Sequence, residues 1–327
     1  MSRPVDVPAL VEAARAGSPR ALARLLSLVE DAHPALREVM ASLAPFGGRA
    51  WVVGVTGAPG VGKSTTTSAL VTALRAKGLR VGVLAVDPSS PFSGGALLGD
   101  RIRMQDHATD PEVFIRSMAT RGHLGGLSWA TPQALRVLDA AGCDVVLVET
   151  VGVGQSEVEV AALADTTLVL LAPGMGDGVQ AAKAGILEIG DVFAVNKADR
   201  DGADACVRDI EYMVRLGGDG RAPGAWRPRV VRCVASRGEG IDDLLDALRA
   251  HTEWARSSGE LERRRLRRAA GEIEAITVTA LRERIGDLRT SHGLEHLAGE
   301  VVAGRTDPWR AADALLADLT TTARGDR

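Results

Sequence analysis

Residues 51–64 read W-V-V-G-V-T-G-A-P-G-V-G-K-S, a short apolar run followed by a glycine-rich loop that ends in lysine and serine. Gly57, Gly62, Lys63 and Ser64 have the spacing of a P-loop, and the next residues, T-T-T-S-A-L-V-T-A-L, are typical of a helix. Backbone N–H groups in such a loop and at the helix N-terminus attract phosphate oxygens. We therefore predict phosphate binding by Gly57, Ala58, Pro59, Gly60, Val61, Gly62, Lys63, Ser64 and Thr65.

Outward from this loop, short apolar runs alternate with helical stretches. The runs are 51–55, 81–86, 145–148, 167–171, 192–195 and 230–234. Most are continuous rather than alternating, which is expected of parallel strands covered on both faces. The pattern predicts an α/β fold, a P-loop NTPase with a doubly wound, mostly parallel sheet.

Helical patterns flank this central region. We expect an N-terminal helical extension over residues 1–48, a P-loop domain over 49–251 and a C-terminal helical region over 252–327. In the first, Ser18 and Pro19 predict a capped helix start. In the last, a heptad stripe predicts dimerisation through this region, with packing onto the central domain as the alternative: Leu266, Ala269, Ile273, Ile276 and Ala280.

Composition excludes several classes of protein. The net charge is −3 and aromatic residues make up 3% of the 327 residues, which argues against a nucleic-acid-binding protein. The three cysteines form no C-x-x-C pair, so a reduced, cytoplasmic setting fits best. We see no secretory leader and no apolar run of about 18 residues, and so expect no membrane partner. The arginine-rich run 263–268 is read as a solvated helix with i,i+4 ion pairs.

Two later loops point to guanine. Asn196-Lys197-Ala198-Asp199 follows an apolar run, and its aspartate would accept hydrogen bonds from both N1–H and the 2-amino group of guanine. Adenine has neither donor and would leave the carboxylate unpaired. Asn196 is expected to tie this loop to the P-loop, while the Lys197 stem covers the base. Ala235, Ser236 and Arg237 would offer backbone N–H groups to guanine O6.

Magnesium and water would be held near the γ-phosphate. The Ser64 hydroxyl is a candidate Mg²⁺ ligand, and Glu149 and Asp87 end apolar runs from which they would approach the same ion. Asp100, in a glycine-rich segment, is a fourth candidate. Lys63 would neutralise charge on the transferring phosphoryl group, and Gln155 would orient the attacking water.

Several long motifs of this chain resemble the MeaB/ArgK family. They are D-P-S-S-P-F-S-G-G-A-L-L-G-D-R-I-R-M at 87–104, F-I-R-S-M-A-T-R-G-H-L-G-G-L at 114–127, V-E-T-V-G-V-G-Q-S-E at 148–157 and A-P-G-M-G-D-G-V-Q-A-A-K-A-G-I-L-E-I-G-D at 172–191. The family consists of GTPases that act as chaperones of adenosylcobalamin-dependent acyl-CoA mutases, chiefly methylmalonyl-CoA mutase. Its members are homodimers joined through C-terminal helices.

The resemblance implies roles for further residues. Asp87, Asp100 and Glu149 become magnesium-site residues, and segments 87–104 and 172–190 become nucleotide-sensing switches. Within the second switch, three residues would relay the nucleotide state to the mutase: Asp177, Gln180 and Lys183. The expected function is GTP hydrolysis that gates cofactor loading and protects or reactivates the mutase. The alternatives are a P-loop kinase with a protein or small-molecule acceptor, and a scaffold that binds GTP without hydrolysing it.

Overall fold

The computed structural model describes residues 5–87, 105–107, 109–119, 130–150, 156–174, 188–217, 224–285 and 292–325. The chain forms two compact units, Met1–Arg268 and Ala269–Arg327. The first contains the P-loop, and the second consists of helices. The limits of the three regions predicted from the sequence, including the dimerisation region 252–327, stay predictions.

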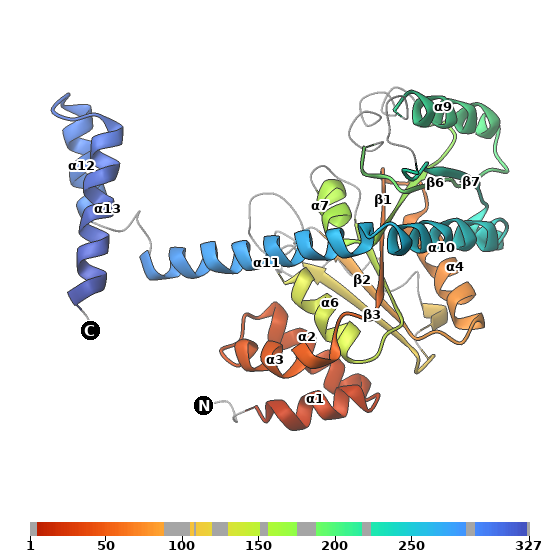
Figure 1. Ribbon diagram of the computed structural model, residues 1–327, viewed down its shortest axis with the longest axis horizontal. Helices are drawn as coiled ribbons and strands as arrows, with labels where there is room; N and C mark the ends of the chain where they lie inside the picture. The colour runs from red at the N-terminus through yellow and green to blue at the C-terminus, as the bar shows by residue number, and fades with distance from the viewer. Residues whose placement is uncertain are drawn as a thin grey trace. The chain divides into compact units, whose positions relative to one another are not determined.

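The centre of the first unit is a seven-stranded sheet in which every paired neighbour is parallel (Figure 1). Its order is β3-β2-β4-β1-β5-β6-β7, which places the P-loop strand β1 in the middle. The strands are β1 Trp51–Gly57, β2 Val81–Asp87, β3 Val113–Ala119, β4 Val145–Thr150, β5 Thr166–Leu171, β6 Val192–Val195 and β7 Arg229–Arg232. The predicted fold class is confirmed.

Strand β3 was not among the apolar runs, and its position explains why. It lies at the edge of the sheet and pairs only with β2 among the strands described. An edge strand is incompletely covered, and Val113–Ser117 are half-buried, so polar Arg116 and Ser117 fit within it. The continuous apolar pattern that marks central strands is therefore absent here.

Helices cover both faces of the sheet. One face carries the N-terminal helices together with α6, α7 and α9, whereas the other carries α4 and α10. The bounds are α1 Val7–Arg15, α2 Pro19–Glu30, α3 Leu36–Leu43, α4 Lys63–Ala76, α6 Thr131–Ala140, α7 Ser156–Leu163, α9 Ala203–Leu216 and α10 Ile241–Ser257. Short 3₁₀ turns occur at η1 Ala44–Phe46, η2 Gln105–His107 and η3 Ala235–Arg237.

The N-terminal helices are part of the core of the first unit. The Ser18 side chain accepts a hydrogen bond from the Ala21 N–H, as its position before Pro19 predicts. Buried residues of α2 share one apolar cluster with α6 and the adjacent strands: Leu22, Leu25, Leu26 and Val29. Burying this apolar face stabilises the domain, because each large aliphatic side chain contributes about 1.5–3 kcal/mol.

The second unit is built from the latter part of α11 Glu260–Ile285 with α12 His292–Val302 and α13 Pro308–Gly325. Asp307 begins α13, where its carboxylate accepts hydrogen bonds from the Trp309 and Arg310 N–H groups. Along α11, several apolar side chains are at least 47% exposed: Leu266, Ile273, Ile276 and Leu281. Within the described part of the chain, no helix has the length and apolar character needed to cross a bilayer.

Candidate nucleotide-binding site

The P-loop joins the end of β1 to the start of α4, and two of its glycines are required by close contacts. Gly57 has a φ of +140°, and a Cβ there would lie 2.2 Å from the Leu170 carbonyl oxygen. Gly62 has a φ of +94°, and a Cβ there would lie 2.4 Å from Nδ2 of Asn196. A side chain at position 57 would collide with the backbone of β5, and one at position 62 would displace the Asn196 amide. The glycines thus let the loop lie close to both β5 and the segment after β6.

Lys63 begins α4 and is folded back onto this loop. Its Nζ donates hydrogen bonds to the Gly57 carbonyl at 2.8 Å and to the Ala58 carbonyl at 3.1 Å, and the residue is 7% exposed. The ammonium group is therefore held at the helix N-terminus, where the macrodipole also favours anions. This places two sources of positive potential where phosphate groups would lie.

Ser64 and Glu149 meet beside the loop. The Ser64 hydroxyl donates a hydrogen bond of 2.6 Å to Oε1 of Glu149, which is 3% exposed and lies near the end of β4. A hydroxyl and a carboxylate are the hard oxygen donors that Mg²⁺ prefers. These two residues, 85 positions apart in the chain, therefore fit a magnesium site.

Asn196 connects three segments of the site. Its Nδ2 donates to the Val61 carbonyl at 2.8 Å, which is the tie to the P-loop that the sequence predicts. Its Oδ1 accepts from the Ala235 N–H at 3.0 Å. Because the side chain is 3% exposed, both bonds lie away from solvent. A single amide thus fixes the P-loop, the segment after β6 and η3 relative to one another.

Lys197 and Asp199 follow Asn196 in the same loop and are less buried than it is. Lys197 has a left-handed backbone, with a φ of +57°, and its Nζ donates to the Gly60 carbonyl at 2.6 Å. The Asp199 side chain is 33% exposed and accepts a hydrogen bond of 3.2 Å from the Arg237 guanidinium. Of the three residues predicted to face guanine O6, Ala235 and Arg237 already donate their N–H groups within the chain, to Asn196 and to the Val234 carbonyl.

Other predicted residues fall outside what the structure describes. Asp87 ends β2 at the same edge of the sheet as Glu149, but the structure does not describe its side chain. Two further site residues, Asp100 and Gln155, lie in segments outside the described residues, as do the three relay residues Asp177, Gln180 and Lys183.

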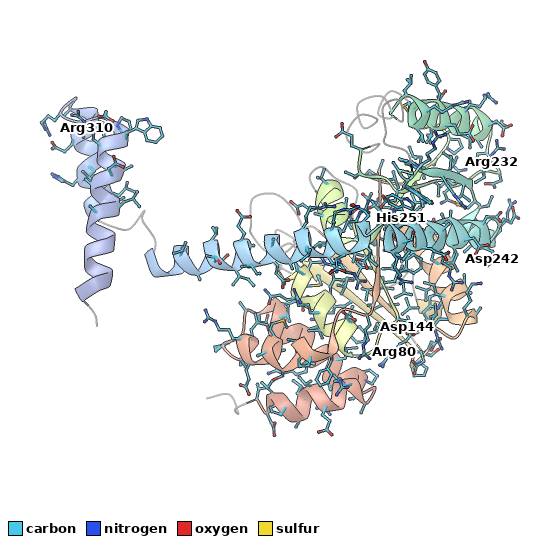
Figure 2. All side chains as sticks on the ribbon, viewed as in Figure 1. Arg80, Asp144, Arg232, Asp242, His251 and Arg310 are labelled. Carbon is cyan, nitrogen blue, oxygen red and sulfur yellow. The ribbon has the colours of Figure 1, made fainter. Side chains whose placement is uncertain are left out.

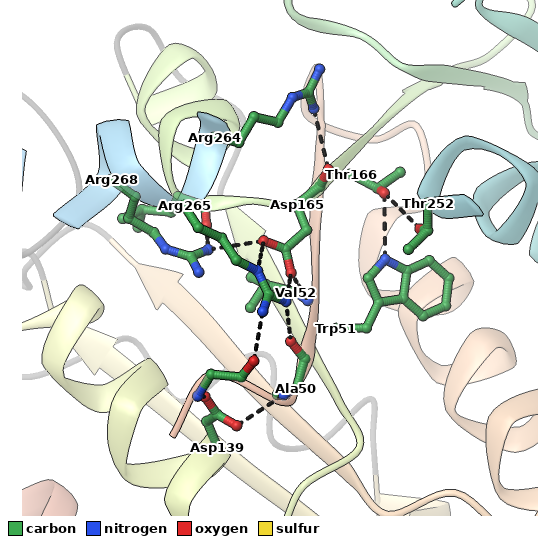
Figure 3. Close-up of polar contacts among 12 residues, drawn as sticks. Ala50, Trp51, Val52, Asp139, Asp165, Thr166, Thr252, Arg264, Arg265 and Arg268 are labelled. Carbon is green, nitrogen blue, oxygen red and sulfur yellow. Dashed lines mark hydrogen bonds and ion pairs between the residues drawn. The ribbon is translucent and has the colours of Figure 1, made fainter. Parts of the chain in front are cut away.

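A second charged cluster lies at the amino ends of the strands, opposite the P-loop (Figure 3). Asp165, just before β5, is 1% exposed and accepts from the Val52 N–H and from Arg265 and Arg268 of α11. Arg265 also donates to the Gly48 and Ala50 carbonyls. This corrects the prediction of a solvated arginine run, because these side chains anchor the first part of α11 to the sheet. Other arginines of the run are exposed and form ion pairs with Glu260, as the prediction states.

Asp191, just before β6, has a similar set of partners. Arg264 donates to both its oxygens, at 2.6 and 2.8 Å, the Thr167 N–H donates at 2.8 Å, and Nε2 of His251 lies 3.2 Å away. Burial alone would raise the pKa of Asp191, but the interactions with nearby His251 and Arg264 outweigh it and lower that pKa to about 2. Asp191 is therefore a buried anion at neutral pH.

His251 completes this cluster on α10 (Figure 2). It is fully buried, and its Nδ1 lies 2.9 Å from the Thr166 hydroxyl oxygen. Trp226 packs edge-on against the ring, with centroids 5.0 Å apart, and its indole N–H donates to the Asp191 carbonyl. The only sequence signal for this cluster is the density of arginines in α11, since their partners are distant in the chain.

Known proteins are similar to this chain in sequence and in fold. A family described as "Methylmalonyl Co-A mutase-associated GTPase MeaB" matches residues 22–289. A protein of Pyrococcus abyssi named as a GTPase is 47% identical over 310 residues, which is 95% of this chain and 96% of that protein. A Caenorhabditis elegans protein named "Methylmalonic aciduria type A homolog, mitochondrial" is 33% identical over 332 residues, covering 95% of this chain and 82% of that protein.

A solved structure has the same fold. The crystal structure of an LAO/AO transport system kinase aligns with a TM-score of 0.71 and 28% sequence identity, covering 98% of this chain and 100% of that chain. The similarity extends over nearly the whole chain and includes the central parallel sheet. The P-loop NTPase fold is therefore shown by the structure and by a related protein.

Proposed function

The chain is a GTPase that belongs to the MeaB family, and we propose that its GTP hydrolysis controls an adenosylcobalamin-dependent acyl-CoA mutase, most specifically methylmalonyl-CoA mutase. The observation that carries this proposal is the match of residues 22–289 to a family described as mutase-associated. The C. elegans relative, whose name refers to methylmalonic aciduria, supports the same partner. In this proposal the protein gates cofactor loading and protects or reactivates the mutase, in the cytoplasm.

The contacts of Lys63, Ser64 and Glu149 support specific roles in hydrolysis, and the roles of Asp87, Asp100 and Gln155 rest on the sequence alone. Lys63 would neutralise the β- and γ-phosphates, and the P-loop N–H groups would stabilise charge that develops during transfer. Ser64 and Glu149 would hold Mg²⁺ together with Asp87 and Asp100, and the bound ion would supply positive charge to the phosphate oxygens. Gln155 would orient the attacking water.

Base recognition would use the segment after β6. Asp199 would accept from N1–H and the 2-amino group of guanine, and the aliphatic stem of Lys197 would cover the base plane. Because Ala235 and Arg237 donate their N–H groups inside the protein, we assign contact with guanine O6 to the Ser236 N–H. Asn196 would keep this base site at a fixed distance from the phosphates.

We also propose a homodimer joined through residues 252–327. The exposed apolar side chains of α11 support this, since Leu266 and Ile273 are 63% and 65% exposed. On α13, Trp309 is 82% exposed. Apolar side chains gathered along helices in this way are typical of surfaces that bind another protein.

The experiment combines the purified chain with the methylmalonyl-CoA mutase of the same organism. Phosphate release from GTP is expected to be slow for the chain alone and to rise about tenfold or more with the mutase, because ordering a switch or supplying an arginine contributes up to about 10³–10⁵ in rate. Complex formation, measured by sedimentation, should differ between a GTP analogue and no nucleotide by the same factor by which the mutase changes GTP affinity.

The same measurements separate the alternatives. Phosphate release without any acceptor excludes an obligate kinase, for which the family match provides no support. If neither GTP turnover nor complex formation responds to the mutase, the chaperone proposal is wrong and the protein is a GTPase with another partner. A mutase that lacks adenosylcobalamin dependence serves as the matched control and should leave turnover unchanged.

A further inference from the structure

The carboxylate that would receive guanine already has a partner within the chain. Nη2 of Arg237 donates to Oδ2 of Asp199 at 3.2 Å. A guanidinium presents adjacent N–H donors in one plane, as guanine does with N1–H and its 2-amino group. Arg237 and a guanine base would therefore compete for Oδ2 of Asp199.

The backbone of Arg237 is held in place while its side chain is exposed. The residue ends η3, whose first residue, Ala235, is bonded to Asn196, and the Arg237 N–H itself donates to the Val234 carbonyl. Its side chain is 58% exposed. The guanidinium is thus able to leave Asp199 by side-chain rotation alone, without moving the loop.

A second carboxylate lies near the Arg237 guanidinium. Oε1 of Glu239 is 3.9 Å from Nη1 of Arg237. Glu239 is positioned by an antiparallel bridge to Val234, whose N–H donates to the Glu239 carbonyl at 2.9 Å. When Arg237 leaves Asp199, it therefore has another anion within reach.

We propose that Arg237 competes with guanine for the Asp199 carboxylate and is displaced by the base onto Glu239, so that it sets the affinity for guanine nucleotides. The inference deepens the proposed function and rests on it, because it assumes that Asp199 receives the base. Arg237 prevents Asp199 from being an unpaired anion before the nucleotide arrives. Adenine lacks both the N1–H and the 2-amino group, so it would leave the ion pair intact.

The size of the effect follows from the exposure of the pair. Ion pairs between partly exposed side chains are weak, so competition by Arg237 should lower guanine nucleotide affinity by about two- to fivefold. Salt screens such pairs. The competition should therefore be largest at low ionic strength and nearly absent in roughly 0.5 M salt.

The test measures the dissociation constant of fluorescently labelled GDP by titration of the full chain. Arg237→Ala is expected to bind GDP about two- to fivefold more tightly at low salt, with the gain lost at high salt. Arg237→Lys, which keeps one charge but loses the planar fork, should give a smaller gain. Arg208→Ala removes an exposed arginine from α9 and serves as the control for net charge.

A double-mutant cycle locates the effect at Asp199. Asp199→Asn should weaken GDP binding and favour xanthosine diphosphate, whose carbonyl replaces the 2-amino donor. In that background, Arg237→Ala should leave the binding of both GDP and xanthosine diphosphate unchanged, because the ion pair is already lost. Additivity of the two substitutions would overturn the proposal.

The outcomes are distinguishable from failure of the proposed function. Unchanged or weaker GDP binding by Arg237→Ala, with a normal loss for Asp199→Asn, overturns the role of Arg237 and leaves the base site intact. If Asp199→Asn does not alter GDP binding, the base site of the proposed function is wrong, and the inference about Arg237 falls with it.

Discussion

Two aspartates flank strand β6 and have opposite surroundings. Asp191, before the strand, is 6% exposed and accepts hydrogen bonds from both terminal nitrogens of Arg264 and from a backbone N–H. Asp199, after the strand, has a side chain that is 33% exposed and pairs with one arginine at 3.2 Å. The residues between them are the four of β6 followed by Asn196, Lys197 and Ala198.

The difference in burial and in partners suits Asp191 to anchoring the structure and Asp199 to binding a ligand. A buried carboxylate surrounded by donors has no acceptor capacity left for a ligand, and breaking its bonds costs folding free energy. A half-exposed carboxylate with one weak partner exchanges that partner at little cost. The amino ends of the strands thus hold the first part of α11, up to Arg268, whereas the carboxyl ends are suited to nucleotide exchange.

The largest effect on activity should come from Lys63→Ala at the P-loop. Removing a charged donor that stabilises the transferring phosphoryl group should lower the GTP hydrolysis rate by about 10²–10³-fold. Phosphate release at saturating GTP measures this. Lys77→Ala, an exposed lysine just after the same helix, is the control and should keep the full rate. Equal rates in both variants would remove Lys63 from the catalytic site.

The largest effect on stability should come from Asp165→Asn at the opposite edge. The substitution leaves Arg265 and Arg268 partly buried without their anion, which should lower the free energy of unfolding by about 3 kcal/mol. Urea denaturation without nucleotide measures the change. Asp204→Asn breaks an exposed pair with Arg232 and should cost about 0–1 kcal/mol. Similar costs for the two variants would contradict the anchoring role.

A smaller, pH-dependent effect is expected at Asp191. Because its folded-state pKa of about 2 lies below the value of about 3.9 in an unfolded chain, the carboxylate stabilises the fold above about pH 4 and loses that contribution as the pH falls toward 2. The shift corresponds to about 2–3 kcal/mol. In denaturation curves at several pH values, the difference between wild type and Asp191→Asn should be complete at and above about pH 5 and should shrink as the pH falls toward 2. A constant difference would show that Asp191 acts through packing rather than charge.

Contiguous motifs determined much of the site. The P-loop requires Gly57 and Gly62 within one short segment, so its pattern is readable without the fold. The segment Asn196–Asp199 is similarly local, and its tie to the P-loop follows from the residue type that such a loop needs. Continuous apolar runs marked the covered strands, because both of their faces are buried.

Only the tertiary structure decided which charged residues serve as anchors. Arg264 has Glu260 at i−4 and reads as a solvated helix surface, yet its bond to Asp191 spans 73 positions. Edge strand β3 lacked the apolar run for a similar reason, since coverage depends on neighbours rather than on local sequence. The pairing of Asp199 with Arg237 joins loops 38 residues apart. Sequence records which groups carry charge, but the energy of a charge depends on its burial and its partners, and chain folding alone sets both.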